Sequence, residues 1–153
     1  MRLSGLTESK SFIQCHLMNE NKILEHKHLI IRAEGKNTPT DEGFLKGWLE
    51  QFIKDIKMKV LMGPYVKYCD MPGNEGITGA AIIETSHIVL HTWNKVEPEL
   101  IQFDVYSCSH LDPEAICKKI KKDFNTTKIE YKYLDREHNL KEIYTIGYDE
   151  LGY

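Results

Sequence analysis

Apolar and polar positions repeat along the first third of the chain with two different periods, which separates a predicted strand from a predicted helix. Residues 28–33 form an apolar run rich in β-branched side chains, as is typical of a buried strand. Residues 38–42 then supply a capping side chain and early acids, which favour a helix start. Beyond them, apolar residues recur every three or four positions, which predicts an amphipathic helix packed on a sheet. The expected buried stripe of this helix consists of Phe44, Leu45, Trp48, Leu49, Phe52, Ile53 and Ile56.

The rest of the chain predicts more strands and one more helix. Residues 59–68 are predicted to form a strand interrupted at Gly63 and Pro64, before a loop rich in Pro, Gly and Asn. Two strand-like segments, 80–84 and 87–93, meet without a typical turn residue. The remaining predicted elements are a strand over 100–106, a helix from 113 to about 124, and a strand over 129–134. No element is assigned to the first 27 residues, and no role to the charged, tyrosine-rich residues 135–153.

This order of elements predicts an α/β (α+β) fold, a two-layer sandwich in which two helices cover one face of a largely antiparallel sheet. The chain has 153 residues, of which 41% are hydrophobic, enough for one ordinary core and too few for two full domains. We therefore expect a single domain over residues 1–153.

Composition excludes several classes of function. The formal net charge is −3 with acids and bases interspersed, so we expect no nucleic-acid partner. Apolar runs are far shorter than the ~20 residues of a membrane span, and no secretory segment is recognisable, which indicates a soluble, cytoplasmic protein without a membrane partner. The four cysteines form no CxxC pair and the histidines show no ligand spacing, so we expect free thiols and no metal.

Three short motifs in the middle of the chain carry the candidate chemistry. They are Gly76-Ile77-Thr78-Gly79, then Ser86-His87 followed by His91-Thr92-Trp93, and then Phe103-Asp104 leading to Ser107-Cys108. In this order, the motifs resemble the core of the prokaryotic S-adenosylmethionine decarboxylase proenzymes, and the resemblance extends over about residues 28–134. It implies decarboxylation of S-adenosylmethionine, which yields the aminopropyl donor for spermidine synthesis.

The resemblance also implies a self-made cofactor and a role for each motif residue. The proenzyme would cleave itself between Thr85 and Ser86, and Ser86 would become a pyruvoyl group whose carbonyl forms a Schiff base with the substrate amine. By the same resemblance, His91 is the base for processing and Thr78 offers a hydroxyl to the developing oxyanion. Cys108 would return a proton to the substrate's α-carbon, a role that suits a largely protonated thiol.

Other features of the resemblance concern substrate binding. Tyr68 matches the aromatic residue that stacks on adenine. The family carries glutamate where this chain has Thr85, and again where it has Lys95; the second glutamate holds the ribose, so Glu97 or Glu99 of the longer loop would replace it. The family resemblance also implies a homodimer with its sites near the interface. Two alternatives are a pyruvoyl-dependent decarboxylase of ornithine or arginine, and an uncleaved homologue without catalysis.

Overall fold

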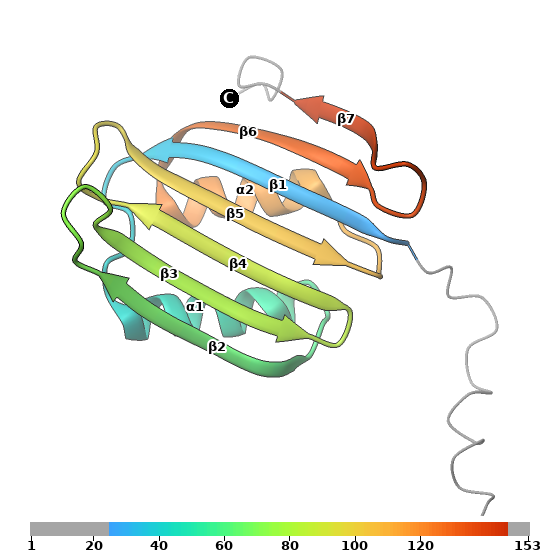
Figure 1. Cartoon of the computed structure of the whole chain (residues 1–153), viewed down its shortest axis with the longest axis horizontal. Helices are drawn as coiled ribbons and strands as arrows, with labels where there is room; N and C mark the ends of the chain where they lie inside the picture. The colour runs from blue at the N-terminus through green and yellow to red at the C-terminus, as the bar shows by residue number, and fades with distance from the viewer. Residues whose placement is uncertain (1–24, 147–153) are drawn as a thin grey trace, which may run out of the picture.

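The computed structural model describes residues 25–146, which form seven strands and two helices (Figure 1). The strands build one sheet in the order β2-β3-β4-β5-β1-β6-β7, and every neighbouring pair is antiparallel. The elements are β1 (Lys27–Gly35), α1 (Glu42–Asp55), β2 (Val60–Cys69), β3 (Gly76–Ile83), β4 (Ser86–Trp93), β5 (Glu99–Ser107), α2 (Pro113–Phe124), β6 (Thr126–Asp135) and β7 (Lys141–Ile146).

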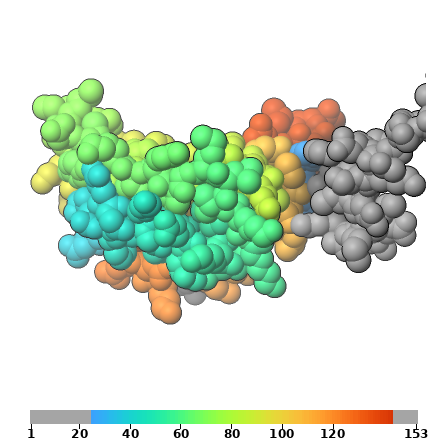
Figure 2. All heavy atoms as spheres, turned by 90° about the horizontal axis from the view of Figure 1, so that it is seen from below, coloured from blue at the N-terminus to red at the C-terminus, as the bar shows by residue number. Residues whose placement is uncertain are grey.

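Both helices cover the same face of the sheet, so the predicted two-layer sandwich is confirmed. Figure 2 shows α1 in cyan and α2 in orange below the layer of strands. Each helix begins at an aspartate N-cap: Asp41 accepts the N–H of Phe44 at 2.6 Å, and Asp112 accepts the N–H of Ala115 at 3.0 Å. The buried side chains of α1 are Leu45, Trp48, Leu49, Phe52 and Ile53.

Three details differ from the predicted elements. Phe44 was expected in the buried stripe, but its side chain is 53% exposed, because it lies in the first turn of α1, away from the core. The strand β2 continues through Gly63 and Pro64, although its register with β3 shifts on either side of Met62. Residues 141–146 pair with β6 as the edge strand β7, although the sequence assigned no role to this tail.

Two glycines of the central motif are required by close packing. A Cβ atom on Gly76 would overlap the backbone carbonyl of Thr92 on β4. A Cβ atom on Gly79 would lie 2.6 Å from Cδ1 of Leu49, which is closer than real Cβ contacts. The motif therefore lets β3 approach both β4 and helix α1, which fixes the position of Thr78 between the two glycines.

The sheet face opposite the helices, called the open face here, carries the polar side chains of the central strands. Residues of β1, β4 and β5 alternate between the buried core under the helices and this face. A hollow in the open face is lined by Ile30, Ile31, Arg32, His87, Val89, His91, Gln102, Phe103 and Asp104. Within residues 25–146, neither helix has the length and apolar character to cross a membrane.

Candidate active site

Ser86 begins β4, directly after the Glu84-Thr85 turn that joins β3 to β4. Its φ angle is 145°, in the positive region that favours glycine and costs other residues about 1–3 kcal/mol. The Thr85 carbonyl accepts the backbone N–H of Cys108 at 2.8 Å, and the Thr85 hydroxyl contacts Sδ of Met58 at 3.1 Å. The peptide bond before Ser86 is therefore held from β5 and from the segment after α1, with its carbonyl polarised by an N–H donor.

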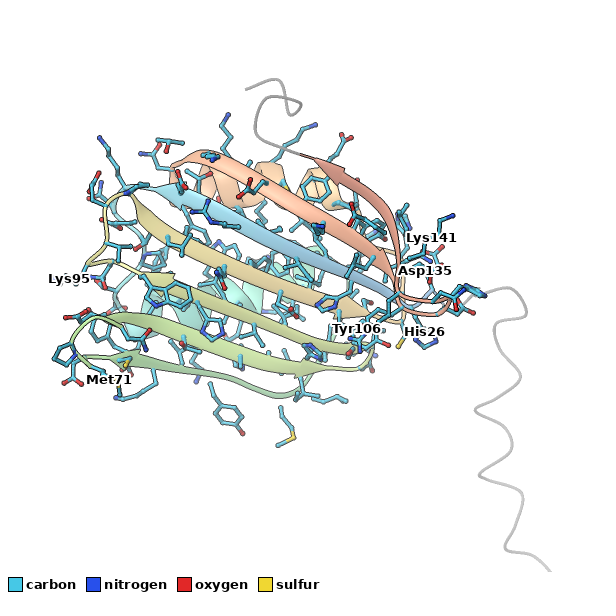
Figure 3. The ribbon with its side chains drawn as sticks, turned by 45° about the horizontal axis from the view of Figure 1, so that its top comes forward. His26, Met71, Lys95, Tyr106, Asp135 and Lys141 are labelled. Carbon is cyan, nitrogen blue, oxygen red and sulfur yellow. The ribbon has the colours of Figure 1, made fainter. Side chains whose placement is uncertain are left out.

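The Cys108 thiol lies at the end of β5, beside a histidine and a tyrosine. Its sulfur is 3.6 Å from Nδ1 of His26, and the same nitrogen is 3.0 Å from the hydroxyl of Tyr106. Figure 3 shows His26 and Tyr106 together at this end of the sheet. Burial and then the neighbouring Cys108 raise the pKa of Tyr106, which keeps its hydroxyl protonated at neutral pH. A thiol in contact with an imidazole has a partner for proton exchange.

A network of one carboxylate and two imidazoles lies next to Ser86 on the open face. Oδ2 of Asp104 is 2.7 Å from Nε2 of His28, and Oδ1 is 3.4 Å from Nε2 of His87. Nδ1 of His87 is 3.2 Å from the hydroxyl oxygen of Ser86. Burial would raise the pKa of Asp104, but the hydrogen bond from His28 and the charges of both histidines outweigh it, so the pKa lies below its ordinary value.

Thr78 and His91 form a second pair on facing positions of β3 and β4. Their side chains are in contact, with 2.9 Å between the Thr78 hydroxyl oxygen and Nδ1 of His91. Burial lowers the pKa of His91, and the charge of Asp104 opposes that shift only in part. The imidazole is therefore neutral at neutral pH, the form that can accept a proton.

Tyr68 lies on the helix side of the sheet, opposite the open face. It pairs with Ile77, which is fully buried, and its ring packs against the edge of the core. Its hydroxyl donates to Oδ1 of Asn94 at 3.0 Å, in the loop between β4 and β5. The predicted adenine platform thus contacts the loop that carries the candidate ribose acids, but not Thr78 or His91.

Glu97 and Glu99, the two candidate ribose-binding residues, differ in the hydrogen bonds that their carboxylates already make within the chain. Oε2 of Glu99 accepts the backbone N–H of Thr38 at 2.6 Å. Burial disfavours the charged form of Glu99, but the hydrogen bonds from Thr38 outweigh it and its pKa is lowered. Glu97 is exposed in the loop. The Glu99 carboxylate therefore already has a hydrogen-bond donor within the chain, whereas the Glu97 side chain is accessible to a ligand.

The predicted site residues fall into two groups at different positions along the sheet. Ser86 and Cys108 are at one end, whereas His91 lies five residues further along β4. At about 3.3 Å per strand residue, Ser86 and His91 are roughly 16 Å apart. The loop with Lys95 is at the far end, away from Tyr106, as Figure 3 shows. Within one chain, His91 therefore does not contact Ser86.

Five residues near Ser86 and Cys108 received no role from the sequence. Each contributes a side chain to the contacts described above, and they are His26, His28, His87, Asp104 and Tyr106. The alternation of residues 102–106 places Asp104 and Tyr106 on one face of a strand. Their histidine partners depend on the register of β1 and β4 against β5, which the sequence alone does not state.

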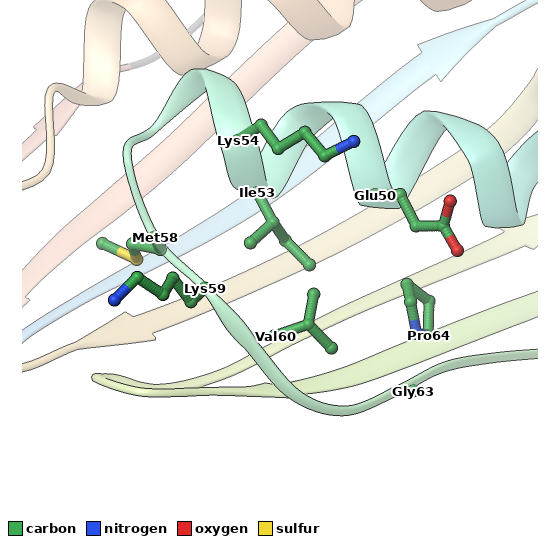
Figure 4. A pocket seen from close by; sticks show the side chains of 8 residues that line it. All are labelled: Glu50, Ile53, Lys54, Met58, Lys59, Val60, Gly63 and Pro64. Atoms are coloured by element: carbon green, nitrogen blue, oxygen red, sulfur yellow. The ribbon is translucent and has the colours of Figure 1, made fainter.

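A groove on the helix side approaches the same turn (Figure 4). It runs between α1 and the edge strand β2, and Met58, which contacts the Thr85 hydroxyl, is one of its residues. Its lining consists of Glu50, Ile53, Lys54, Met58, Lys59, Val60, Gly63 and Pro64. The turn before Ser86 is thus supported from the helix side as well as from β5.

Thiols and metal ligands elsewhere add little to this site. Cys69, Cys108 and Cys117 are free, and burial raises the pKa of Cys117 to about 12, so this thiol stays protonated. Cys15 lies outside the described residues. Within residues 25–146, one group of side chains could hold an ion, formed by the half-buried Asp135 and the exposed Glu137 and His138. The Asp135 carboxylate, however, already accepts the backbone N–H groups of its two partners.

Comparisons with known proteins agree with the motifs. Residues 27–137 match the family model of S-adenosylmethionine decarboxylase. An S-adenosylmethionine decarboxylase proenzyme of Clostridium botulinum strain Hall is 30% identical over 112 residues, which cover 71% of this chain and 91% of the relative. A proenzyme of the same name from Pyrobaculum arsenaticum is 41% identical over 64 residues, 41% of this chain and 50% of the relative. This chain therefore belongs to the S-adenosylmethionine decarboxylase family.

Proposed function

We propose that this protein decarboxylates S-adenosylmethionine with a pyruvoyl group made from its own Ser86, yielding the aminopropyl donor for spermidine synthesis. The observation that carries the proposal is the geometry of the bond between Thr85 and Ser86. A serine with a positive φ angle follows a carbonyl that already accepts an N–H from Cys108. Strain at the serine and a donor at the carbonyl oxygen both favour attack of the hydroxyl on that carbonyl.

The self-cleavage needs an attack, an elimination and a hydrolysis. The Ser86 oxygen bonds to the Thr85 carbonyl carbon, the peptide C–N bond breaks, and the nitrogen takes a proton, which leaves an ester with a free α-amine. A base then removes the Ser86 Cα proton, and Thr85 leaves as a carboxylate. This elimination leaves dehydroalanine, which tautomerises to an imine by moving a proton from nitrogen to Cβ. Water then adds to the imine carbon, ammonia departs, and the keto group remains. Through these steps the N–H of Cys108 stabilises the negative charge on the Thr85 oxygen.

The residues around Ser86 also fit the later decarboxylation. When formed, the pyruvoyl group supplies the electron sink for carbon dioxide loss. The Cys108 thiol is positioned at the same end of the sheet to donate a proton to the substrate carbon, and His26 at 3.6 Å can replace that proton. Glu97 accepts the ribose hydroxyls, since Glu99 is bonded to Thr38.

The active protein is a homodimer in which two chains share each site. His91 and Thr78 are needed for processing, but in one chain they lie roughly 16 Å from Ser86. Packing two open faces about a two-fold axis across the strands puts the Ser86 end of one chain over the His91 end of its partner. The open face offers Ile30 and Ile82, which are 40% and 46% exposed, to such an interface. The site is incomplete without the second copy.

The experiment that tests the substrate compares carbon dioxide release from three carboxyl-labelled amino acids under identical conditions. S-adenosylmethionine should be the preferred substrate over ornithine and arginine, because the exposed Glu97 carboxylate in the loop after β4 can accept the ribose hydroxyls of a nucleoside. Faster release from ornithine or arginine would overturn the proposed substrate while leaving the pyruvoyl chemistry in place. Ser86→Ala is the control, because it lacks the hydroxyl that forms the cofactor and should release no carbon dioxide.

A further inference from the structure

We infer that His87 is the general base that takes the proton from the Ser86 hydroxyl, with Asp104 as its positioning residue. This inference rests on the proposed self-cleavage and concerns its first step, the attack on the Thr85 carbonyl. The later removal of the Cα proton stays with His91. The two histidines thus act on different protons of the same serine.

The contacts run in one line from the hydroxyl to a carboxylate. The Ser86 hydroxyl oxygen is 3.2 Å from Nδ1 of His87, and Nε2 on the other side of the ring is 3.4 Å from Oδ1 of Asp104. With its ring proton on Nε2, His87 has a free lone pair on Nδ1 for the serine proton. Serine, histidine and aspartate follow one another as in a hydrolytic triad. In that triad Nε2 faces the serine and Nδ1 the aspartate, whereas here Nδ1 faces Ser86 and Nε2 faces Asp104.

Asp104 is held in place to orient this ring. Its Oδ2 is bonded to His28 at 2.7 Å, which fixes the carboxylate on the open face. Its Oδ1 is buried and, among the described residues, has no hydrogen-bond partner. A buried carboxylate oxygen without a partner is costly, and a small shift of His87 would supply the missing N–H. Proton uptake at Nδ1 makes the ring cationic, and the same carboxylate then stabilises that charge.

The proton is conserved through the step. It leaves the Ser86 oxygen for His87 as the oxygen bonds to the Thr85 carbonyl carbon, and the negative charge on the Thr85 oxygen meets the N–H of Cys108. His87 then gives the proton to the Ser86 nitrogen as the peptide bond breaks. The ring ends neutral, and no other reactant is required. All these groups belong to one chain, whereas His91 and Thr78 of the shared site come from the partner.

The test follows cleavage over time after synthesis in vitro, by intact mass. His87→Ala should slow cleavage by about 100- to 10,000-fold, the usual contribution of a general base. His87→Gln should be equally slow, because an amide cannot take the proton, although it fills the same space. Added imidazole should restore cleavage in His87→Ala and not in His87→Gln. Asp104→Asn should slow cleavage less than either. His138→Ala, at a histidine whose side chain is 71% exposed, is the matched control and should behave as the wild type.

Hydroxylamine identifies the step that fails, because it cleaves an ester far faster than a peptide bond. His91→Ala should accumulate the ester and be split by hydroxylamine, whereas His87→Ala should remain intact. Wild-type cleavage rates in both His87 variants, ester accumulation in His87→Ala, or failed rescue by imidazole would each overturn the role of His87. A wild-type chain that never cleaves would instead overturn the proposed function itself, so the two failures are distinguishable.

Discussion

Ser86 combines a reactive hydroxyl with a backbone conformation that favours glycine. Neither Ser86→Gly nor Ser86→Ala can cleave, so their unfolding free energies can be compared on intact chains. The glycine variant should be more stable by about 1–3 kcal/mol, because only glycine adopts the φ angle of 145° without strain. Urea unfolding measures the difference.

Ser107 is the matched control for this comparison, because it faces Ser86 across β4 and β5. In ordinary strand geometry, glycine is less stable than alanine, so the order of the two variants should reverse there. Equal unfolding free energies of Ser86→Gly and Ser86→Ala would contradict the claim that the backbone at Ser86 is strained.

In the proposed mechanism, Cys108 acts through its backbone before cleavage and through its thiol afterwards. Cys108→Ala keeps the N–H that binds the Thr85 carbonyl, so the chain should still cleave. Turnover should fall by about 100- to 10,000-fold, because the proton donor is lost. Intact mass and carbon dioxide release measure the two effects separately. Cys69→Ala, at the far end of β2, should retain both, and a wild-type rate in Cys108→Ala would remove the thiol from the mechanism.

The motifs offered candidates for the side chains that carry the chemistry, whose roles stay predictions, but they did not indicate the neighbours of these side chains. Ser86, His91 and Cys108 were selected as candidates because their spacing along the sequence resembles that of the family. The contacts of Cys108 with His26, and of Asp104 with His28, join residues 76 or more positions apart. Such contacts are set by the pairing of β1 with β5, and a periodic pattern in one strand does not contain that information.

At the scale of elements, the glycines of β3 allow a direct test of the packing. In the Ser86→Ala background, Gly76→Ala should lower the free energy of unfolding by about 1–3 kcal/mol or more, because its Cβ overlaps the Thr92 carbonyl. Gly47 is the control, since it lies inside α1 with nothing within 4 Å of a Cβ atom. Gly47→Ala should stabilise by about 1 kcal/mol. A loss of stability at Gly47 or none at Gly76 would contradict this packing.

Periodicity predicted the elements wherever one face is buried against the helices. The two helices and the central strands have regular apolar positions, and they were predicted within a few residues. The edge strands β2 and β7 were not predicted as the structure has them. The strand β7 is charged along residues 141–142 and its Ile143 is 41% exposed, so burial leaves no pattern there. The sequence predicted β2 as interrupted at Gly63 and Pro64, whereas the strand passes through them with a register shift.

At the scale of the whole molecule, the separation of Ser86 from His91 predicts complementation between two inactive chains. A dimer of a Ser86→Ala chain and a His91→Ala chain contains one intact shared site, formed by the Ser86 of one chain and the His91 of the other. Co-expressed with different tags, the His91→Ala chain should be cleaved, although alone it stops at the ester. If neither chain is cleaved in the mixed dimer, the proposal that two chains share each site is wrong.

The intact mass of the purified protein tests the central claim most directly. The account predicts two fragments, residues 1–85 and residues 86–153, the second lighter than a serine-terminated peptide by the mass of ammonia because a keto group has replaced the amine. Ser86→Ala should give one full-length chain. A single uncleaved wild-type chain, or a Ser86→Ala chain that splits at the same bond, would contradict the pyruvoyl enzyme proposed here.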